Sequence, residues 1–142
     1  MSHTKLLNKI KAYGIDGKLY EWVSDFLNGR SQAVKIEGVL SNTITVTSGV
    51  PQGSVLGPIL FLIFINDMCD LFVDLNVKYK LIADDLKLYA SRTNVEAIND
   101  LTIALKRIES WCEEWQLCLA TNKCSVLQLG PRSSNLPQVN YK

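Results

Sequence analysis

An unbroken apolar run, Val55–Ile65, follows directly on a loop built around two glycines and a proline, Gly49–Ser54. A membrane span needs about 20 apolar residues, and polar residues end this run at about half that length. The run therefore predicts a buried core helix, which extends from Val55 or Pro58 to about Phe72 and is preceded by a sharp turn. Pro58 suits the first helical turn, because backbone N–H groups there have no partner within the helix.

Two adjacent acids, Asp84 and Asp85, lie between two short segments in which apolar and polar residues alternate, Val77–Ala83 and Leu86–Ala90. This pattern predicts a tight β-hairpin with the acids at its tip, where Asp tolerates unusual backbone angles. Carboxylates are ligands that Mg²⁺ prefers, and a bound cation offsets the repulsion between neighbouring acids. The pair is therefore a candidate metal site, although adjacent strand residues point to opposite faces. Taken alone, a solvated turn is the commoner explanation.

The Gly49–Ser54 loop is equally open to two interpretations. Its glycines and proline are typical of a simple connection between a strand and a helix. They also allow the backbone to approach a nucleic-acid strand closely, with Gln52 available to hydrogen-bond a base or a sugar.

Hydrophobic periodicity predicts the remaining elements of the chain. The expected helices cover residues 4–13, Asp16–Leu27 and, capped by Asn94, a stretch that reaches Trp115. The expected strands are residues 31–37 and Thr43–Thr47, joined by a turn within Gly38–Asn42, and a last strand, Ser125–Leu129. The helix after Asn94 should bury the stripe Ile98, Leu101, Leu105, Ile108, Cys112 and Trp115.

From Val55 onward the expected order is helix, strand, strand, helix, strand. That order is most of a split βαβ sandwich, so the predicted fold class is α+β, with an antiparallel sheet backed by helices. The length of 142 residues and the hydrophobic content of 47% suit a single domain with a core. Within it we expect a helical and hairpin segment over residues 1–47, a central core over 48–130 and a frayed tail over 131–142.

Charge and cysteine usage exclude some functions and leave others open. The net charge of +1 gives no argument for nucleic-acid binding by itself, although basic residues can gather locally. His3 is the only histidine and none of the four cysteines forms a C-x-x-C pair, so a zinc site is not expected. No secretory signal is recognisable, which favours an intracellular protein with reduced thiols and no membrane segment.

Three stretches in fixed order carry a specific resemblance to a known family: SGVPQGSVLGPILF at residues 48–61, IND at 65–67 and ADDLKLY at 83–89. Together they resemble the reverse transcriptase of non-long-terminal-repeat retrotransposons, the jockey-like elements in particular. The flanks are similar too. HTKLL at residues 3–7 and YGI at 13–15 look like the segment that follows the family's first palm aspartate. Residues 111–117 and 122–124 look like the helix and the start of the strand that follow the metal-binding hairpin. The resemblance covers essentially the whole chain.

The resemblance implies the palm of an RNA-directed DNA polymerase, which copies RNA into DNA by two-metal nucleotidyl transfer. Asp84 and Asp85 would be its catalytic and metal-binding acids, with Mg²⁺, or Mn²⁺, as cofactor. Lys123 lies near the place of a lysine proposed as a general acid for pyrophosphate departure, although a lone lysine is more often simply solvated. The implied partners are an RNA template, a DNA primer and deoxynucleotides. The loop residues implied to contact template and nucleotide are Gly49, Pro51, Gln52, Gly53 and Ser54.

The chain also departs from the family pattern. The family's first metal-binding aspartate lies just before the stretch that begins here at Ser2, and its primer-grip hairpin would begin at Tyr141. Ile82 stands where the family commonly has an aromatic residue. Two functions therefore compete: a polymerase fragment that is inactive alone because it lacks the first aspartate, and a non-catalytic remnant that at most binds nucleic acid, weakly, or a protein. Ancestry favours the first, and the missing acid favours the second.

Overall fold

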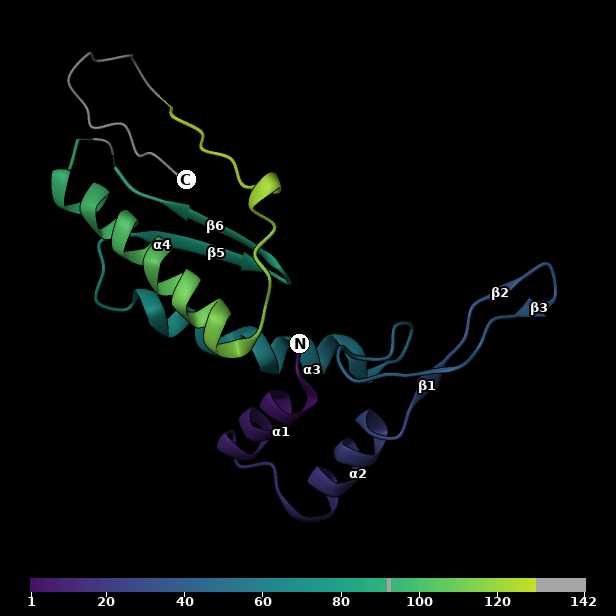
Figure 1. The fold of residues 1–142 in the computed structure, drawn as a ribbon. Coiled ribbons are helices and arrows are strands. Elements are labelled where there is room, and N and C mark those ends of the chain that lie inside the picture. Colours follow the sequence, from purple (N-terminus) through teal and green to yellow (C-terminus); the bar gives the residue numbers. More distant parts are fainter. Residues whose placement is uncertain (92, 130–142) are drawn as a thin grey trace. The chain divides into compact units, whose positions relative to one another are not determined.

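The computed structural model describes residues 1–91 and 93–129. The chain divides into two compact units, Met1–Asp67 and Met68–Lys142, and each is described here by itself (Figure 1). The described residues contain helices and small antiparallel sheets, which confirms the predicted α+β class. The expectation of a single domain stays a prediction. None of the described helices is long and apolar enough to cross a membrane.

Three helices form the core of the first unit: α1 (His3–Ala12), α2 (Gly17–Leu27) and α3 (Leu56–Ile65). The helices α1 and α2 match the predicted helices to within a few residues, because glycines with left-handed backbone end or separate the periodic segments, whereas α3 begins as predicted and ends earlier. Gly14, for example, follows α1 with φ of 78°. The buried apolar side chains of this unit come from all three helices: Leu6, Leu7, Ile10, Val23, Leu27, Leu60, Phe64 and Ile65.

A thin hairpin connects α2 to the loop before α3. Its outer ladder pairs β1 (Ser31–Gln32) with β4 (Ile44–Thr45), and its inner ladder pairs β2 (Lys35–Ile36) with β3 (Val39–Leu40). The predicted antiparallel pairing is confirmed, but the turn is Glu37-Gly38 rather than a longer turn within Gly38–Asn42. Both turn residues have positive φ, 49° and 89°, as a two-residue turn that follows the twist of its strands requires.

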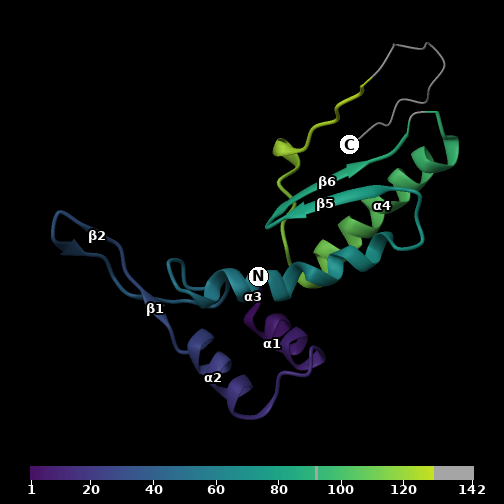
Figure 2. The same ribbon diagram turned by 180° about the vertical axis from the view of Figure 1, so that it is seen from behind.

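The second unit is built from a hairpin and a long helix. The 3₁₀ segment η1 (Asn66–Phe72) leads from α3 into this unit. The helix predicted to reach Phe72 is therefore α-helical only as far as Ile65 and continues as the tighter 3₁₀ helix. Strands β5 (Lys78–Ile82) and β6 (Asp85–Tyr89) pair antiparallel, and α4 (Val95–Trp115) runs along one face of them (Figures 1 and 2). The buried apolar residues are Met68, Phe72, Val77, Ala97, Ala104, Ile108, Trp111 and Cys112.

The helix α4 begins as predicted but buries a different stripe. The Asn94 side chain accepts a hydrogen bond from the Ala97 amide at 3.2 Å, which is the expected N-cap. Ile108 and Cys112 are buried as predicted, whereas Ile98, Leu101, Leu105 and Trp115 are only half-buried. Ala97, Ala104 and Trp111, which lie outside the predicted stripe, are buried instead, so the face toward the core is rotated from the predicted one.

The predicted last strand, Ser125–Leu129, is wrong. A short 3₁₀ turn, η2 (Thr121–Lys123), follows α4, and residues 124–129 form no regular structure. A strand exists only where its backbone finds a partner, and this segment joins none of the described ladders. The split βαβ sheet is therefore represented, among the described residues, by the β5–β6 pair. The tail expected over 131–142 lies outside the described residues.

Candidate catalytic site

The Gly49–Ser54 loop is braced by its own backbone and by one hydroxyl. Ser54 Oγ donates to the Pro51 carbonyl at 2.6 Å and accepts from the Gly57 amide at 3.1 Å, so it links the loop to the start of α3. A Cβ atom on Gly57 would meet the Pro51 oxygen and Ser54 Oγ, both at 3.1 Å. Gly49 and Gly53 have φ of 86° and 77°, which favours glycine at both positions. The loop therefore has a defined conformation.

The N-terminal end of α1 holds the start of this loop. The His3 ring nitrogen Nε2 lies 2.8 Å from the Gly49 carbonyl oxygen, and the Gly49 amide donates to the Met1 carbonyl at 2.8 Å. Ser2 and Ser48 form an antiparallel bridge beside them. His3 is only 8% exposed. Sequence reasoning did not predict this role for His3, although the residue stands in one of the stretches that carried the family resemblance.

The other end of α1 holds the end of α3. Lys9 is buried, and its ammonium donates to the Phe64 carbonyl at 2.6 Å and to the Asp67 carboxylate at 2.5 Å. The same ammonium lies 4.8 Å from the centroid of the Phe64 ring. Near the same helix end, the Asn66 side chain donates to the Tyr13 hydroxyl at 3.2 Å. The loop and α3 are thus tied to α1 at both ends, a role for Lys9 that the lysine pattern alone did not predict.

The two candidate acids occupy different backbone positions. Ile82 pairs with Asp85, so the two-residue turn is Ala83-Asp84, and Asp85 is already the first residue of β6. The positive φ expected for an aspartate falls on Ala83 instead, at 50°. Both carboxylates are exposed. The predicted hairpin is confirmed, but the prediction that both acids lie at its tip is wrong: Asp84 is in the turn, whereas Asp85 belongs to strand β6.

The donor chemistry of this pair fits a hard divalent cation, but the pair alone does not complete a site. Carboxylate oxygens suit Mg²⁺, which commonly takes one or two of them and completes its shell with water and phosphate oxygens. The described residues contain no cluster of three His, Cys, Asp or Glu side chains able to hold a metal. Lys123 is exposed in η2, where its amide donates to the Ala120 carbonyl at 2.8 Å. Its place in the proposed chemistry rests on the family resemblance alone.

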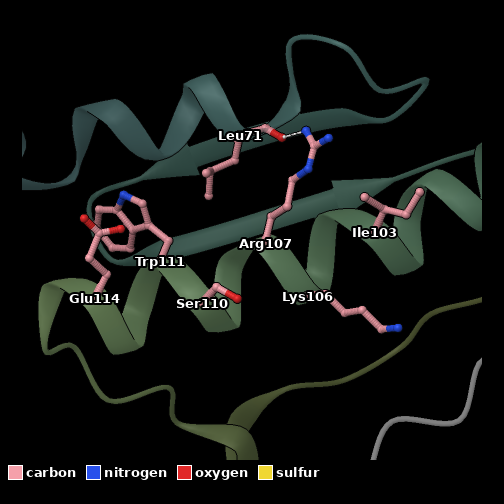
Figure 3. Close-up of a pocket in the computed structure, with 7 residues that line it drawn as sticks. All are labelled: Leu71, Ile103, Lys106, Arg107, Ser110, Trp111 and Glu114. Atoms are coloured by element: carbon pink, nitrogen blue, oxygen red, sulfur yellow. Dashed lines mark hydrogen bonds between the residues drawn. The ribbon is translucent and has the colours of Figure 1, made fainter.

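A cavity of about 350 Å³ lies on α4, away from the predicted site residues. Figure 3 shows it between the helix and Leu71, whose carbonyl accepts a hydrogen bond from Arg107 at 2.7 Å. The same guanidinium binds both oxygens of Asp74, at 2.5 and 2.8 Å, and so lowers the pKa of that carboxyl to about 2. Burial raises the pKa of the nearby Cys112 thiol, which is typical of a packing residue. The cavity lining contains none of the predicted site residues.

Comparison with known proteins decides the family. The family model described as "Reverse transcriptase (RNA-dependent DNA polymerase)" matches residues 1–140. The chain belongs to the reverse transcriptase family. The match confirms the resemblance that the loop and the acid hairpin suggested, and it covers both compact units. No solved structure matches this reverse transcriptase segment significantly.

Several curated relatives of this reverse transcriptase segment come from mobile elements of Drosophila. The RNA-directed DNA polymerase from mobile element jockey of Drosophila melanogaster is 31% identical over 97% of this chain. Its namesake from Drosophila funebris is 32% identical over 87%, and the probable RNA-directed DNA polymerase from transposon X-element of Drosophila melanogaster is 32% identical over 85%. The alignments cover 16%, 14% and 14% of those proteins. The chain therefore spans only a small part of the relatives that it matches.

Proposed function

We propose that this chain is the part of an RNA-directed DNA polymerase that carries the Gly49–Ser54 loop, which contacts template and nucleotide, and the β5–β6 hairpin with its two acids. In the complete enzyme it acts on an RNA template, a DNA primer and deoxynucleotides. The observation that carries the proposal is the pair Asp84 and Asp85 at a tight turn, in a chain that matches the reverse transcriptase family over residues 1–140. The Gly49–Ser54 loop, which hydrogen bonds of His3 and Ser54 hold in one conformation, supports the proposal. A template or nucleotide needs a backbone surface of constant shape to bind in one position.

In this proposal each carboxylate contributes an oxygen ligand to a divalent cation, Mg²⁺ or alternatively Mn²⁺. Bound metal would stabilise charge on the attacking and leaving oxygens of nucleotidyl transfer. Asp85 directs its oxygen from a strand and Asp84 from the turn, so the two approach a cation from different backbone positions. Gln52, which is exposed in the loop, would hydrogen-bond a base or a sugar. Lys123 would donate a proton to the departing pyrophosphate.

The 142-residue chain alone does not polymerise DNA in this proposal. Asp84 and Asp85 alone do not supply the further acid that the two metal ions would share. The described residues place no third acid beside this pair. The same observation supports a second function, that of a non-catalytic remnant which binds nucleic acid or a protein. The two functions differ in what happens when the segment is returned to a longer polymerase.

The test is a chimera in which residues 1–142 replace the matching segment of the jockey polymerase from Drosophila melanogaster. Primer extension on an RNA template should be measurable in the chimera and absent from the isolated chain. Asp84→Asn and Asp85→Asn should each lower extension on the order of a hundredfold or more, because a lost ligand removes several kcal/mol of charge stabilisation. Asp25→Asn, an exposed acid on α2, is the matched control and should leave extension unchanged.

Three results would contradict the proposal. Templated incorporation by the isolated chain, abolished by Asp84→Asn, would show that the third acid is not needed. A folded chimera that never extends a primer would favour the non-catalytic remnant. Full activity of both Asn variants in the chimera would remove the acids from the catalytic site.

A further inference from the structure

The register of the β5–β6 hairpin gathers lysines on one face. Residues directly opposite each other in an antiparallel pair point to the same side, as do residues two apart along a strand. Lys80 pairs with Lys87, and Lys78 pairs with Tyr89. These four side chains therefore share one face, here called the lysine face. The next pair on that face is Ile82 with Asp85, so the candidate metal ligand Asp85 lies at its end.

Burial shows which side of the hairpin faces water. The opposite face carries Tyr79, Leu81, Leu86 and Leu88, and its three leucines are half-buried. The Tyr79 ring lies 5.0 Å from the ring of the buried Phe72, which fixes that face toward the core of the unit. All three lysines are exposed and Tyr89 is 46% exposed. In both views α4 lies on one side of the hairpin, which agrees with this assignment (Figures 1 and 2).

This arrangement costs stability. Like charges directly opposite each other on a sheet are destabilising, and Lys80 stands opposite Lys87. Asp85 is the one acidic member among the cross-strand pairs on this face. The whole chain carries a net charge of only +1, so three cations on one short hairpin are a local concentration. A polyanion laid across this face would turn the repulsion into attraction.

We propose that the lysine face binds the backbone phosphates of a single nucleic-acid strand and directs that strand toward Asp85. This inference rests on the proposed function, and it names the surface and the partner chemistry that serve the acid pair. Lysine ammonium groups contact phosphates without regard to sequence, and an exposed tyrosine ring offers a platform for one base. Binding is therefore weak, independent of sequence and strongly dependent on salt.

The experiment uses the 142-residue chain and a fluorescently labelled uridine RNA of about 20 nucleotides, long enough for one such surface. The double variant Lys80→Gln with Lys87→Gln should bind on the order of tenfold more weakly at low salt. The slope of log affinity against log salt should become shallower by about 1.4, since two phosphate contacts are lost from a single strand. Replacement of both lysines by arginine should retain binding, because the charge is kept.

The matched control is Lys18→Gln with Lys106→Gln, which removes two exposed lysines from α2 and α4 and changes the net charge equally. It should change affinity far less. The melting temperature gives an independent signature, because loss of the Lys80–Lys87 repulsion should hold or raise it while binding falls. If the Gln pair fails to fold, lysine labelling of the wild-type chain replaces it: RNA should protect Lys80 and Lys87 and leave Lys18 reactive.

Several outcomes would overturn the lysine face without touching the proposed function. If the hairpin and control variants lose RNA affinity equally, the effect comes from net charge alone and not from the lysine face. Retained binding together with aggregation of the Gln variant would mean that the lysines only guard exposed strand edges against pairing. A wild-type chain that does not bind the RNA at low salt would also overturn it. Failure of the proposed function is read separately, from primer extension by the chimera.

Discussion

At the scale of single residues, the turn between β5 and β6 combines strain with chemistry. Ala83 has φ of 50°, a left-handed conformation that an alanine adopts only at a cost of about 1–2 kcal/mol. Asp84 follows in the same turn and Asp85 begins the strand. The strain is placed beside the candidate metal ligands rather than on them. The position of each carboxylate therefore depends on a neighbour that pays a conformational cost.

Ala83→Gly should stabilise the hairpin by roughly 1 kcal/mol, because glycine adopts positive φ without the clash of a Cβ atom. Thermal or denaturant unfolding of the 142-residue chain measures the change. Ala90→Gly, just after β6 and without positive φ, is the control and should be neutral or destabilising. A loss of stability on Ala83→Gly would contradict the turn geometry.

At the scale of elements, helices act as holders of the segments that carry chemistry. The helix α1 contacts the Gly49 carbonyl through His3 and the end of α3 through Lys9. In the second unit, α4 holds the connection between η1 and β5. Asp100 accepts hydrogen bonds from the Asn76 amide and side chain at 2.9 and 3.1 Å, and Arg107 binds Asp74. Polar side chains on α1 and α4 thus hold the loops beside them.

The Asp74–Arg107 pair should make the stability of the second unit depend on pH. The guanidinium lowers the pKa of Asp74 from its ordinary 3.8 to about 2 in the folded chain. A lowered pKa means that the pair stabilises the fold above pH 4 and that this contribution fades as pH falls toward 2. Melting curves of wild type and Asp74→Asn should therefore differ at pH 5 and converge near pH 2.

Arg107→Gln offers the matched comparison for that measurement. It should reproduce the behaviour of Asp74→Asn, and the double variant should add little to either single change. Because the Asp74 side chain is 65% exposed and that of Arg107 is 36% exposed, water screens the pair and the difference between the melting curves should be small. A difference that stays constant from pH 5 to pH 2 would show that the ion pair does not cause it.

At the scale of the whole molecule, each of the two compact units buries apolar side chains of its own. Phe64 is fully buried in the first unit, and Ala104 is fully buried in the second. The apolar run that follows the glycine loop supplies Leu60, Phe64 and Ile65 to the first core. The next segment, η1, supplies Met68 and Phe72 to the core of the second unit. Two consecutive segments of the sequence therefore contribute to the two cores.

Phe64→Ala should destabilise the first unit by about 3–5 kcal/mol, the usual cost of removing a buried aromatic side chain. Phe61→Ala, at a half-buried position of the same helix, should cost clearly less. Hydrogen exchange of the α1 and α3 amides measures both effects in the unit concerned. Equal costs for the two variants would show that the buried face of α3 is assigned incorrectly.

Local chemistry made much of the element map predictable. Left-handed glycines, the Asn94 cap and the apolar periodicities act over a few residues, so the helices α1, α2 and α4 lie close to their predicted bounds. The acid hairpin and the glycine loop followed from the same short-range signals. The expected strand at 125–129 failed because β-branched and apolar composition does not supply a hydrogen-bonding partner.

The sequence by itself determined the family, the order of elements as far as α4 and the identity of the candidate acids, because each is written in contiguous residues. The tertiary structure alone decided which groups meet across long separations. His3 reaches Gly49 and Lys9 reaches Asp67 across 46 and 58 positions of chain. It also decided that Ala104 rather than Leu105 is fully buried, and that Asp85 shares a face with Lys87. Burial and strand register depend on residues that are distant in the sequence, and a local sequence pattern does not identify them.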